Sequence, residues 1–203
     1  MRKRKLVLST SNEHKVEEIK NILEDLSIEV VSKKDVGLGD LDVIEDGETL
    51  EENSFKKAKA LSERVDYMVL ADDTGLFVDA LNGEPGVYSA RYAGEEGNDE
   101  KNNNKLLQKL GNKSLGDRNA KFETVIVLIT ENKEKIVVSG ECKGKIGFEP
   151  KGNNGFGYDS LFIPKGYDKS FGELGEETKN EISHRAKALE NLKEELKNML
   201  EVD

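Results

Sequence analysis

The chain has 203 residues, enough for one sizeable core or for two smaller lobes that share a sheet. Its 41 acidic and 31 basic residues give a formal net charge of -10. That balance argues against a general nucleic-acid binder, which needs a basic surface. Because no apolar run approaches membrane-spanning length and the chain start leads into a predicted strand, we expect a cytoplasmic protein without a membrane partner. Cys142 is the only cysteine, which excludes disulfide frameworks and cysteine-based zinc sites.

The first half of the chain alternates between strand and helix patterns. Residues 5–8 and 28–32 predict two short strands. Between them, apolar residues recur at helical spacing and predict one buried helix face: Val16, Ile19, Leu23 and Leu26. A capping box at residues 49–52 begins a second helix, which leads into an apolar strand at 67–71.

The second half contains two β-rich runs and a final helix. Residues 122–130 and 135–144 predict strands joined by a hairpin turn at 131–134. A C-terminal helix that covers the sheet is predicted by Leu189, Leu192, Leu196 and Met199. The order of elements predicts an α/β fold with a mixed sheet.

Two adjacent carboxylates, Asp72 and Asp73, follow the predicted strand at 67–71. Burial of unpaired carboxylates is unfavourable, and ligands of open α/β sheets bind at the carboxyl ends of strands. The pair therefore indicates a divalent-metal site at a sheet edge. In the alternative interpretation, Asp72 caps the next turn and Asp73 is solvated.

The segment at 45–47 offers a further carboxylate, Glu45, as a partner for Asp73 around a metal. Magnesium takes one or two protein carboxylates together with substrate phosphates, which suits such a sparse pair. The alternative is a solvated acidic loop. Lys57, in the helix that follows, could reach a phosphate, although most helix lysines are surface charges.

The polar turn at residues 10–15 lies between a predicted strand and a helix start. Unpaired backbone N–H groups and the helix dipole make such a turn a potential anion site, to which Lys15 adds a charge. The turn lacks the glycines of a P-loop. Simple N-capping by Ser11 or Asn12 is the alternative.

Two later segments have the composition of a ligand site. Glycines around Phe156 would let backbone approach a ligand while the ring offers a stacking face, unless the segment is an ordinary glycine-rich hairpin with a buried aromatic. His184 and Arg185 are donors for acceptor oxygens. On one helix Lys179 and His184 lie about 140° apart around the axis, so both can face one ligand only if the helix starts or kinks between them. Otherwise Lys179 belongs to a solvated helix face.

Together these segments resemble the Ham1-like, or inosine triphosphate pyrophosphatase, family of non-canonical purine nucleoside triphosphatases. The resemblance covers nearly the whole chain and keeps the motifs in order. It is carried by residues 10–15 with Glu18, 52–54 with 57–58, 71–81, 83–94, 155–159 and 182–185.

The resemblance implies a single domain over residues 1–203, with a long mixed sheet that forms two lobes, flanking helices and an active cleft between the lobes. It implies a homodimer that hydrolyses inosine, deoxyinosine and xanthosine triphosphates to the monophosphate and pyrophosphate with Mg2+. By similarity, Asp73 accepts the proton of the attacking water and contacts the metal with Glu45. The residues expected to hold the triphosphate are Thr10, Ser11, Asn12, Glu13, His14, Lys15, Lys57 and Thr74. Those expected to hold the base are Phe156, Gly157, Tyr158, Asp159, Lys179, His184 and Arg185.

Donors such as Arg185 would favour the oxygen at ring position six of hypoxanthine and xanthine over the amino group of adenine. The same argument does not exclude guanine. Ala186 replaces the glycine that usually follows His-Arg in the family and could shift base preference. Two alternatives remain open: a Maf-like pyrophosphatase for pyrimidine or modified nucleotides, and a nucleotide sensor without turnover. The presence of Asp73, Glu45 and Lys15 together argues against a sensor.

Overall fold

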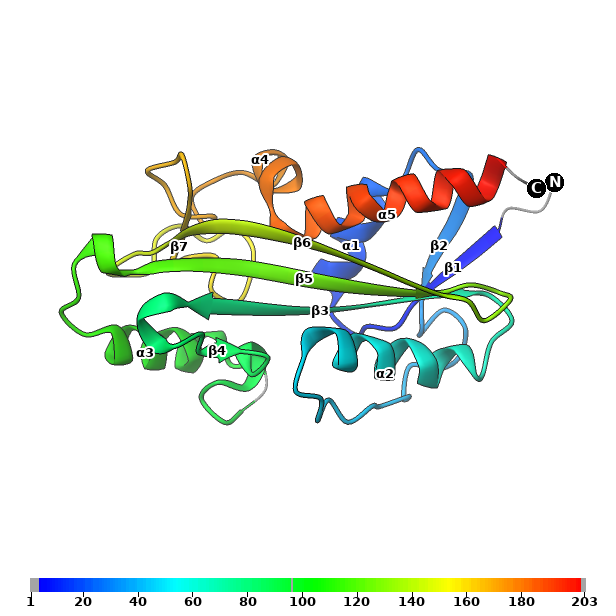
Figure 1. Ribbon diagram of the computed structural model, residues 1–203, viewed down its shortest axis with the longest axis horizontal. Helices are drawn as coiled ribbons and strands as arrows, with labels where there is room; N and C mark the ends of the chain where they lie inside the picture. Colours follow the sequence, from blue (N-terminus) through cyan, green and yellow to red (C-terminus); the bar gives the residue numbers. More distant parts are fainter. Residues whose placement is uncertain (1–3, 96, 202–203) are drawn as a thin grey trace. The chain divides into compact units, whose positions relative to one another are not determined.

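The computed structural model describes residues 4–95 and 97–201 (Figure 1). The chain divides into two compact units. The first unit consists of Met1–Asp73, Thr124–Gly140 and Ala186–Asp203, and the second of Thr74–Glu123 and Glu141–Arg185. Three strands pass from one unit to the other: β3 (Met68–Val78), β5 (Asn119–Ile129) and β6 (Lys135–Ile146).

The first unit adds two strands and three helices to its parts of β3, β5 and β6. These elements are β1 (Arg4–Leu8), α1 (Glu13–Ile22), β2 (Ile28–Ser32), α2 (Leu50–Ser62) and α5 (His184–Glu201). Its strands are ordered β2-β1-β3-β5-β6, and β1 pairs in parallel with both β2 and β3. This order confirms the predicted β-α-β-α-β start, including the strand at 28–32.

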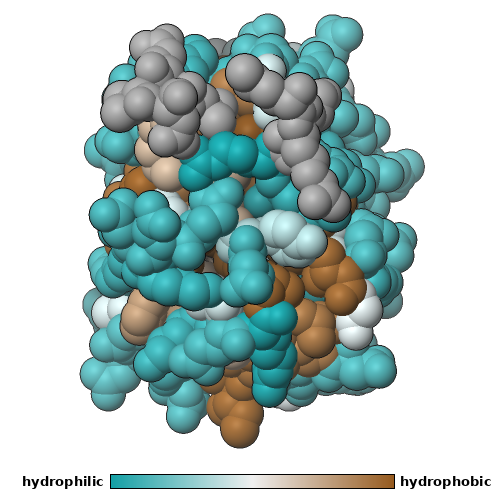
Figure 2. Space-filling view, turned by 90° about the vertical axis from the view of Figure 1, so that its right-hand side faces the viewer, coloured by the Kyte–Doolittle hydropathy of each residue, from teal (hydrophilic) through white to brown (hydrophobic). Residues whose placement is uncertain are grey.

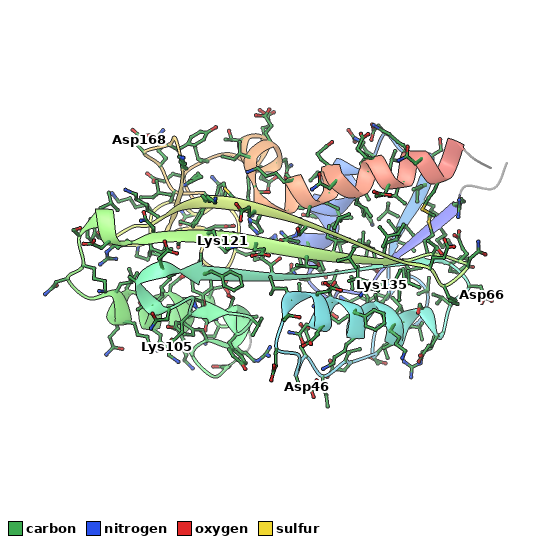
Figure 3. All side chains as sticks on the ribbon, viewed as in Figure 1. Asp46, Asp66, Lys105, Lys121, Lys135 and Asp168 are labelled. Carbon is green, nitrogen blue, oxygen red and sulfur yellow. The ribbon has the colours of Figure 1, made fainter. Side chains whose placement is uncertain are left out.

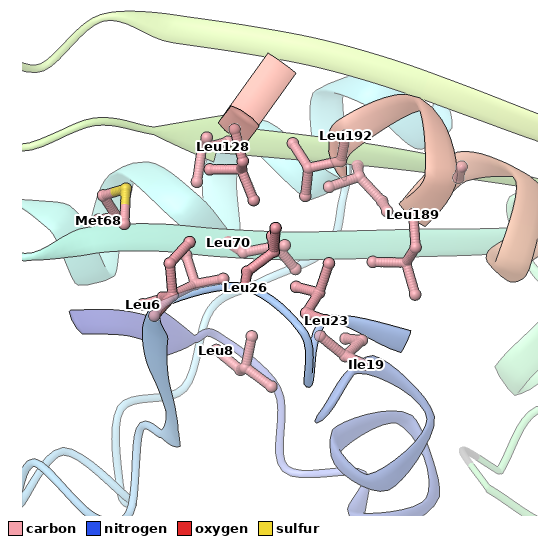
Figure 4. Packing of buried hydrophobic residues seen from close by; sticks show 14 residues of the cluster. Leu6, Leu8, Ile19, Leu23, Leu26, Met68, Leu70, Leu128, Leu189 and Leu192 are labelled. Atoms are coloured by element: carbon pink, nitrogen blue, oxygen red, sulfur yellow. The ribbon is translucent and has the colours of Figure 1, made fainter. Parts of the chain in front are cut away.

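The sheet of the first unit is buried on both faces, so its strands are apolar at successive positions. Alternate residues of β1, β3 and β5 join α1 and α5 in one cluster, which Figure 4 shows from nearby; its members include Leu6, Leu8, Ile19, Met68, Leu70, Leu128, Leu189 and Leu192. The intervening residues pack with α2 in a second cluster: Val7, Ala58, Leu61, Val69, Ala71, Val127 and Ile129. The two-residue period of a strand therefore assigns each side chain of β3 to one helix layer or the other.

The second unit adds two short strands and two helices. These are β4 (Pro85–Gly86), α3 (Asp99–Leu110), β7 (Phe162–Pro164) and α4 (Glu176–Ile182), with 3-10 turns at Asp79–Leu81, Ser89–Arg91 and Leu115–Asp117. β4 pairs antiparallel with β3, and β7 antiparallel with β6. The core contains the aromatic side chains Tyr92, Phe122, Tyr158, Phe162 and Phe171.

The predicted α/β class with a mixed sheet is confirmed, and three local predictions change. The strand expected at 67–71 continues to Val78, because β4 pairs with it at Leu76 and Phe77. Helix α3 was not expected, since three consecutive asparagines at 102–104 are poor helix formers. The helical pattern at 178–185 breaks at Ser183, whose φ of -70° and ψ of 162° are extended.

The face drawn in Figure 2 is mostly hydrophilic, with smaller hydrophobic areas between charged side chains. This surface agrees with a sequence in which 35% of residues are charged. Across residues 4–95 and 97–201, no helix combines the length and apolar character needed to cross a bilayer.

Leu192→Ala tests the cluster beneath α5. Leu192 is fully buried, so the substitution removes apolar contacts and leaves a cavity that costs about 2–5 kcal/mol of unfolding free energy. Ile44→Ala is the control, because Ile44 is 79% exposed and its loss should change stability by less than about 0.5 kcal/mol. Urea titrations of both variants measure the difference. Equal effects would show that α5 does not contribute to the core in this way.

Candidate functional site

Asp72 and Asp73 lie inside β3 and not at its end, which corrects the sequence-based prediction. Both are buried, so the alternative of a solvated Asp73 is also wrong. As neighbours on a strand they point to opposite faces of the sheet. Asp72 follows Leu70 toward the α1 layer, and Asp73 follows Ala71 toward the α2 layer. The two carboxylates form ion pairs with different lysines, although Lys15 also acts electrostatically on Asp73 and Lys57 on Asp72.

Asp72 forms an ion pair with Lys15 of α1, with 2.9 Å between the ammonium nitrogen and Oδ2. The Asp72 side chain is only 1% exposed and that of Lys15 14%. Breaking a buried ion pair by removing one partner leaves an uncompensated charge. The pair thus holds the Lys15 ammonium, in the first turn of α1, beside β3.

The turn before α1 is organised by its own side chains. Asn12 is the N-cap and accepts a hydrogen bond from the Lys15 N–H at 3.2 Å, while Thr10 Oγ1 accepts from the Asn12 N–H at 3.1 Å. The capping alternative is therefore confirmed for Asn12. Ser11, Glu13 and His14 are exposed. Their contact with a triphosphate stays a prediction.

On the α2 face, Lys57 lies between two carboxylates. Its ammonium nitrogen is 2.9 Å from Glu45 Oε2 and 3.7 Å from Asp73 Oδ1. Burial lowers the pKa of Lys57, but Asp73 and Glu45 outweigh it, so the pKa is raised overall. Burial raises the pKa of Asp73, and the charges of Lys57 and Lys15 offset this only in part. Glu45 therefore belongs to a structured site, whereas its neighbour Asp46, labelled in Figure 3, pairs with Lys56 near the surface.

A buried asparagine, Asn53 of α2, joins the Glu45 loop to this cluster. Its Oδ1 accepts the Gly47 N–H at 2.8 Å, and its amide group lowers the pKa of Asp73. A Cβ at Gly47 would lie 2.6 Å from Asn53 Oδ1, so a glycine is needed there. The next residue, Ser54, donates to the carbonyl of Ala71 at 2.8 Å. The Glu52-Asn53-Ser54 segment carried the family resemblance, but its sequence gave no role for Asn53.

The donor set at Glu45 and Asp73 fits a magnesium ion. Both carboxylates already converge on one positive group, the Lys57 ammonium. No group of three or more histidine, cysteine or acidic residues forms a metal cage in the part of the chain that the structure describes. Two carboxylates without a cage suit Mg2+, which keeps several waters and uses substrate phosphates as further ligands.

In the second unit, the predicted base-binding residues form a second cluster. Asp159 is buried, and its Oδ2 accepts the Phe156 N–H at 3.0 Å and the Lys179 ammonium at 2.8 Å. Lys179 lies over the Phe156 ring at 4.8 Å, and the Arg185 guanidinium is 5.7 Å from its centroid. Lys179 is buried, so it does not belong to a solvated helix face.

The break at Ser183 explains how Lys179 and Arg185 reach the same ring. Lys179 belongs to α4 and His184 begins α5, so the two are not on one continuous helix. Arg185 is almost fully buried and donates from Nη2 to Thr74 Oγ1 at 3.3 Å. His184 instead stacks on Phe122, with 4.6 Å between centroids. Tyr158 is also buried, and its hydroxyl donates to the carbonyl of Ser89 at 2.8 Å.

Sequence comparison places these clusters in a known family. Residues 6–195 match the profile of the Ham1 family. The chain belongs to the Ham1 family. It is 51% identical over 203 residues to a dITP/XTP pyrophosphatase of Clostridium perfringens, with 97% of this chain and 99% of the relative covered. A dITP/XTP pyrophosphatase of Haemophilus influenzae is 48% identical, with 96% and 100% covered.

Solved structures agree in fold. The Ham1 protein of Staphylococcus aureus aligns with a TM-score of 0.86 and 41% identity, covering 97% of this chain and all 100% of that one. A nucleoside-triphosphatase and dITP/XTP pyrophosphatase of Mycobacterium abscessus aligns with a TM-score of 0.75 and 39% identity, covering 93% and 98%. The family resemblance read from the motifs is thus confirmed.

Asp73→Asn should stabilise the protein at pH 7 in the presence of a metal chelator. The pKa of Asp73 is raised above its usual 3.8, so ionisation of this carboxyl group opposes folding. The contribution of protonated Asp73 to the free energy of unfolding is fully present below pH 3.8. It is lost as the pH rises through the raised pKa of Asp73. The neutral variant should therefore have the higher thermal midpoint at pH 7, with the difference shrinking toward pH 3.8. A variant that unfolds at a lower temperature than the unmodified protein at pH 7 would show that the attraction between Asp73 and Lys57 outweighs the cost of burying the carboxylate.

Proposed function

We propose that the protein hydrolyses inosine, deoxyinosine and xanthosine triphosphates to the monophosphate and pyrophosphate, and so removes deaminated purines from the nucleotide pool. Support comes from relatives named dITP/XTP pyrophosphatase at about half identity over nearly the full chain. The observation that carries the proposal is the Glu45–Lys57–Asp73 group, a buried carboxylate held beside a cation and a second carboxylate. A nucleotide sensor would have no use for such a group.

In this proposal the triphosphate binds with the start of α1. The turn at residues 10–15 supplies backbone N–H groups at a helix N-terminus, and Lys15 and Lys57 supply positive charge. Glu45 and Asp73 would hold Mg2+. Such a metal, when bound, neutralises phosphate charge and makes pyrophosphate a better leaving group.

Asp73 is the proposed base that orients and deprotonates the attacking water. A base acts most effectively when its pKa lies close to the working pH, and burial moves the pKa of Asp73 upward in that direction. The charges of Lys57 and Lys15 oppose this rise in the pKa of Asp73. Asn53 would keep the carboxylate aligned with the loop that carries Glu45.

The second cluster is proposed to hold the base. Phe156 would stack on the purine, and Gly157, Tyr158 and Asp159 would shape the loop around it. Lys179 and Arg185 would provide donors for the oxygen at ring position six, and His184 would complete the pocket. Thr74, whose hydroxyl accepts from Arg185, would lie near the triphosphate. These donors disfavour the amino group of adenine, because two facing donors leave both unsatisfied.

The wider setting follows from the same resemblance. We propose a homodimer that works in the cytoplasm as a single functional domain over residues 1–203. Nucleic acid is not expected as a partner, given the net charge of -10. Ala186 is buried after Arg185, and its methyl group is a proposed influence on base preference.

Initial rates with a substrate panel test the proposal. ITP, dITP and XTP should release pyrophosphate in the presence of Mg2+, with ATP and dATP at least about tenfold slower because of the donor mismatch. Omission of Mg2+ should abolish turnover. A preference for pyrimidine nucleotides would indicate a Maf-like activity instead. Binding of ITP without any product would indicate a sensor.

Asp73→Asn should lower kcat by about 10²-fold or more, because it removes the proton acceptor and a metal ligand. Asp46→Asn is the matched control, since Asp46 lies in the same loop, is exposed and pairs with Lys56. It should keep nearly full activity. Pyrophosphate release measures both variants, and full turnover by Asp73→Asn would remove Asp73 from the mechanism.

Phe156→Ala should raise KM for ITP about tenfold with a smaller effect on kcat, because a stacking contact with a base is worth about 1–3 kcal/mol. Phe148→Ala is the control: this exposed ring also contacts a cation, the Arg118 guanidinium at 4.5 Å, but lies outside the base cluster. Steady-state kinetics of both variants make the comparison. Equal KM values would assign base stacking to another residue.

A further inference from the structure

Helix α3 holds the loop that carries Phe156. Asp99, in its first turn, accepts the Gly157 N–H at 2.6 Å, and Asn103, one turn later, donates from Nδ2 to the Gly157 carbonyl at 3.1 Å. Two side chains four positions apart on one helix face therefore hold both backbone groups of a single residue. Gly157 has a φ of +63°, a conformation that side chains rarely adopt.

This clamp acts on the residue next to Phe156. On its other side, Phe156 is fixed through its own N–H, which donates to Asp159 at 3.0 Å. Asp159 also binds the Lys179 ammonium that lies over the ring. The position of the ring thus depends on two supports: Asp159 within the loop, and α3 outside it.

The composition of α3 is unfavourable for folding alone. Asparagine competes with the helical backbone for hydrogen bonds. Asn103 is also buried, and its Oδ1 has no hydrogen-bond partner among the described residues. A buried acceptor without a partner destabilises the folded state. The benefit that offsets this cost is the placement of Gly157.

We propose that Asp99 and Asn103 are positioning residues that set the Phe156 ring for the purine base and thereby determine affinity and base selectivity. This inference rests on the proposed function, because it assigns a role in that same site. Neither residue needs to touch the substrate. Their effect passes through the Gly157 peptide to the neighbouring aromatic ring.

The adjacent asparagine provides a matched control. Asn102 is also buried, donates to the Ala90 carbonyl at 3.1 Å and accepts the Ala93 N–H at 2.7 Å. These hydrogen bonds hold a different loop, residues 90–93, against the same helix. Asn102→Ala should therefore resemble Asn103→Ala in thermal stability, but it should leave KM for ITP unchanged.

Asn103→Ala and the isosteric Asn103→Asp, which cannot donate to the Gly157 carbonyl, should each raise KM for ITP about fivefold or more with kcat nearly unchanged. Discrimination between ITP and ATP should fall in parallel. In a Phe156→Ala background the same changes should have no further effect on KM, because the ring that they position is gone. A purely structural role would lower the thermal midpoint without this dependence on Phe156.

The inference is overturned if KM and selectivity of the Asn103 variants match those of Asn102→Ala, or if the Asn103 and Phe156 effects on KM multiply independently. Either result leaves the proposed function intact, since the unmodified protein still hydrolyses ITP. If the unmodified protein does not hydrolyse ITP, the proposed function fails and this inference fails with it.

Discussion

The two-residue period of β3 is the constraint on which the site depends. The sheet of the first unit is covered on both faces, so each of two adjacent carboxylates is buried and depends on positive charge from the flanking helices. Helix α1 supplies Lys15 to Asp72, and α2 supplies Lys57 to Asp73. One strand thereby fixes two lysines on opposite faces. On the α2 face a second carboxylate, Glu45, also pairs with Lys57, and it completes the donor set proposed above for Mg2+.

The difference between the two carboxylates follows from their surroundings. Asp72 forms an ion pair with Lys15 at 2.9 Å and holds that lysine beside β3. Asp73 shares its lysine with Glu45, and burial raises its pKa despite the nearby charges. A buried carboxylate whose charge is only partly compensated lowers the stability of the folded state. The same raised pKa makes it a better proton acceptor. The same reasoning applies in the second unit, where Asp159 fixes Lys179 rather than facing solvent.

The β-α-β-α-β start, the two long strands that follow and the C-terminal helix could be predicted from sequence, because they depend on local periodicity and capping. Residues 28–32 and the stripe on α5 are examples. The full length of β3 could not be predicted, because polar residues interrupt its apolar run. The strand that pairs with its second half, β4, comes from further along the chain. Chemistry-bearing residues such as Asp73 and Lys15 were identifiable by type and motif. Their assignment to opposite faces required the true length of the strand.

Helix α3 was missed for a related reason. Its asparagines argue against a helix locally, and only the loops that they hold explain their presence. The break at Ser183 was easier to anticipate from sequence, because Lys179 and His184 cannot share a face of one continuous helix. Local helix propensity therefore failed to predict structure where side chains form hydrogen bonds to a distant segment of the chain.

The central claim is that Asp73 directs water to the innermost phosphorus of a purine triphosphate. Hydrolysis of ITP in water enriched in oxygen-18, followed by mass spectrometry of the products, tests it most directly. The account predicts that the label enters IMP and that pyrophosphate is unlabelled. Label in pyrophosphate, or formation of IDP and orthophosphate, would contradict it.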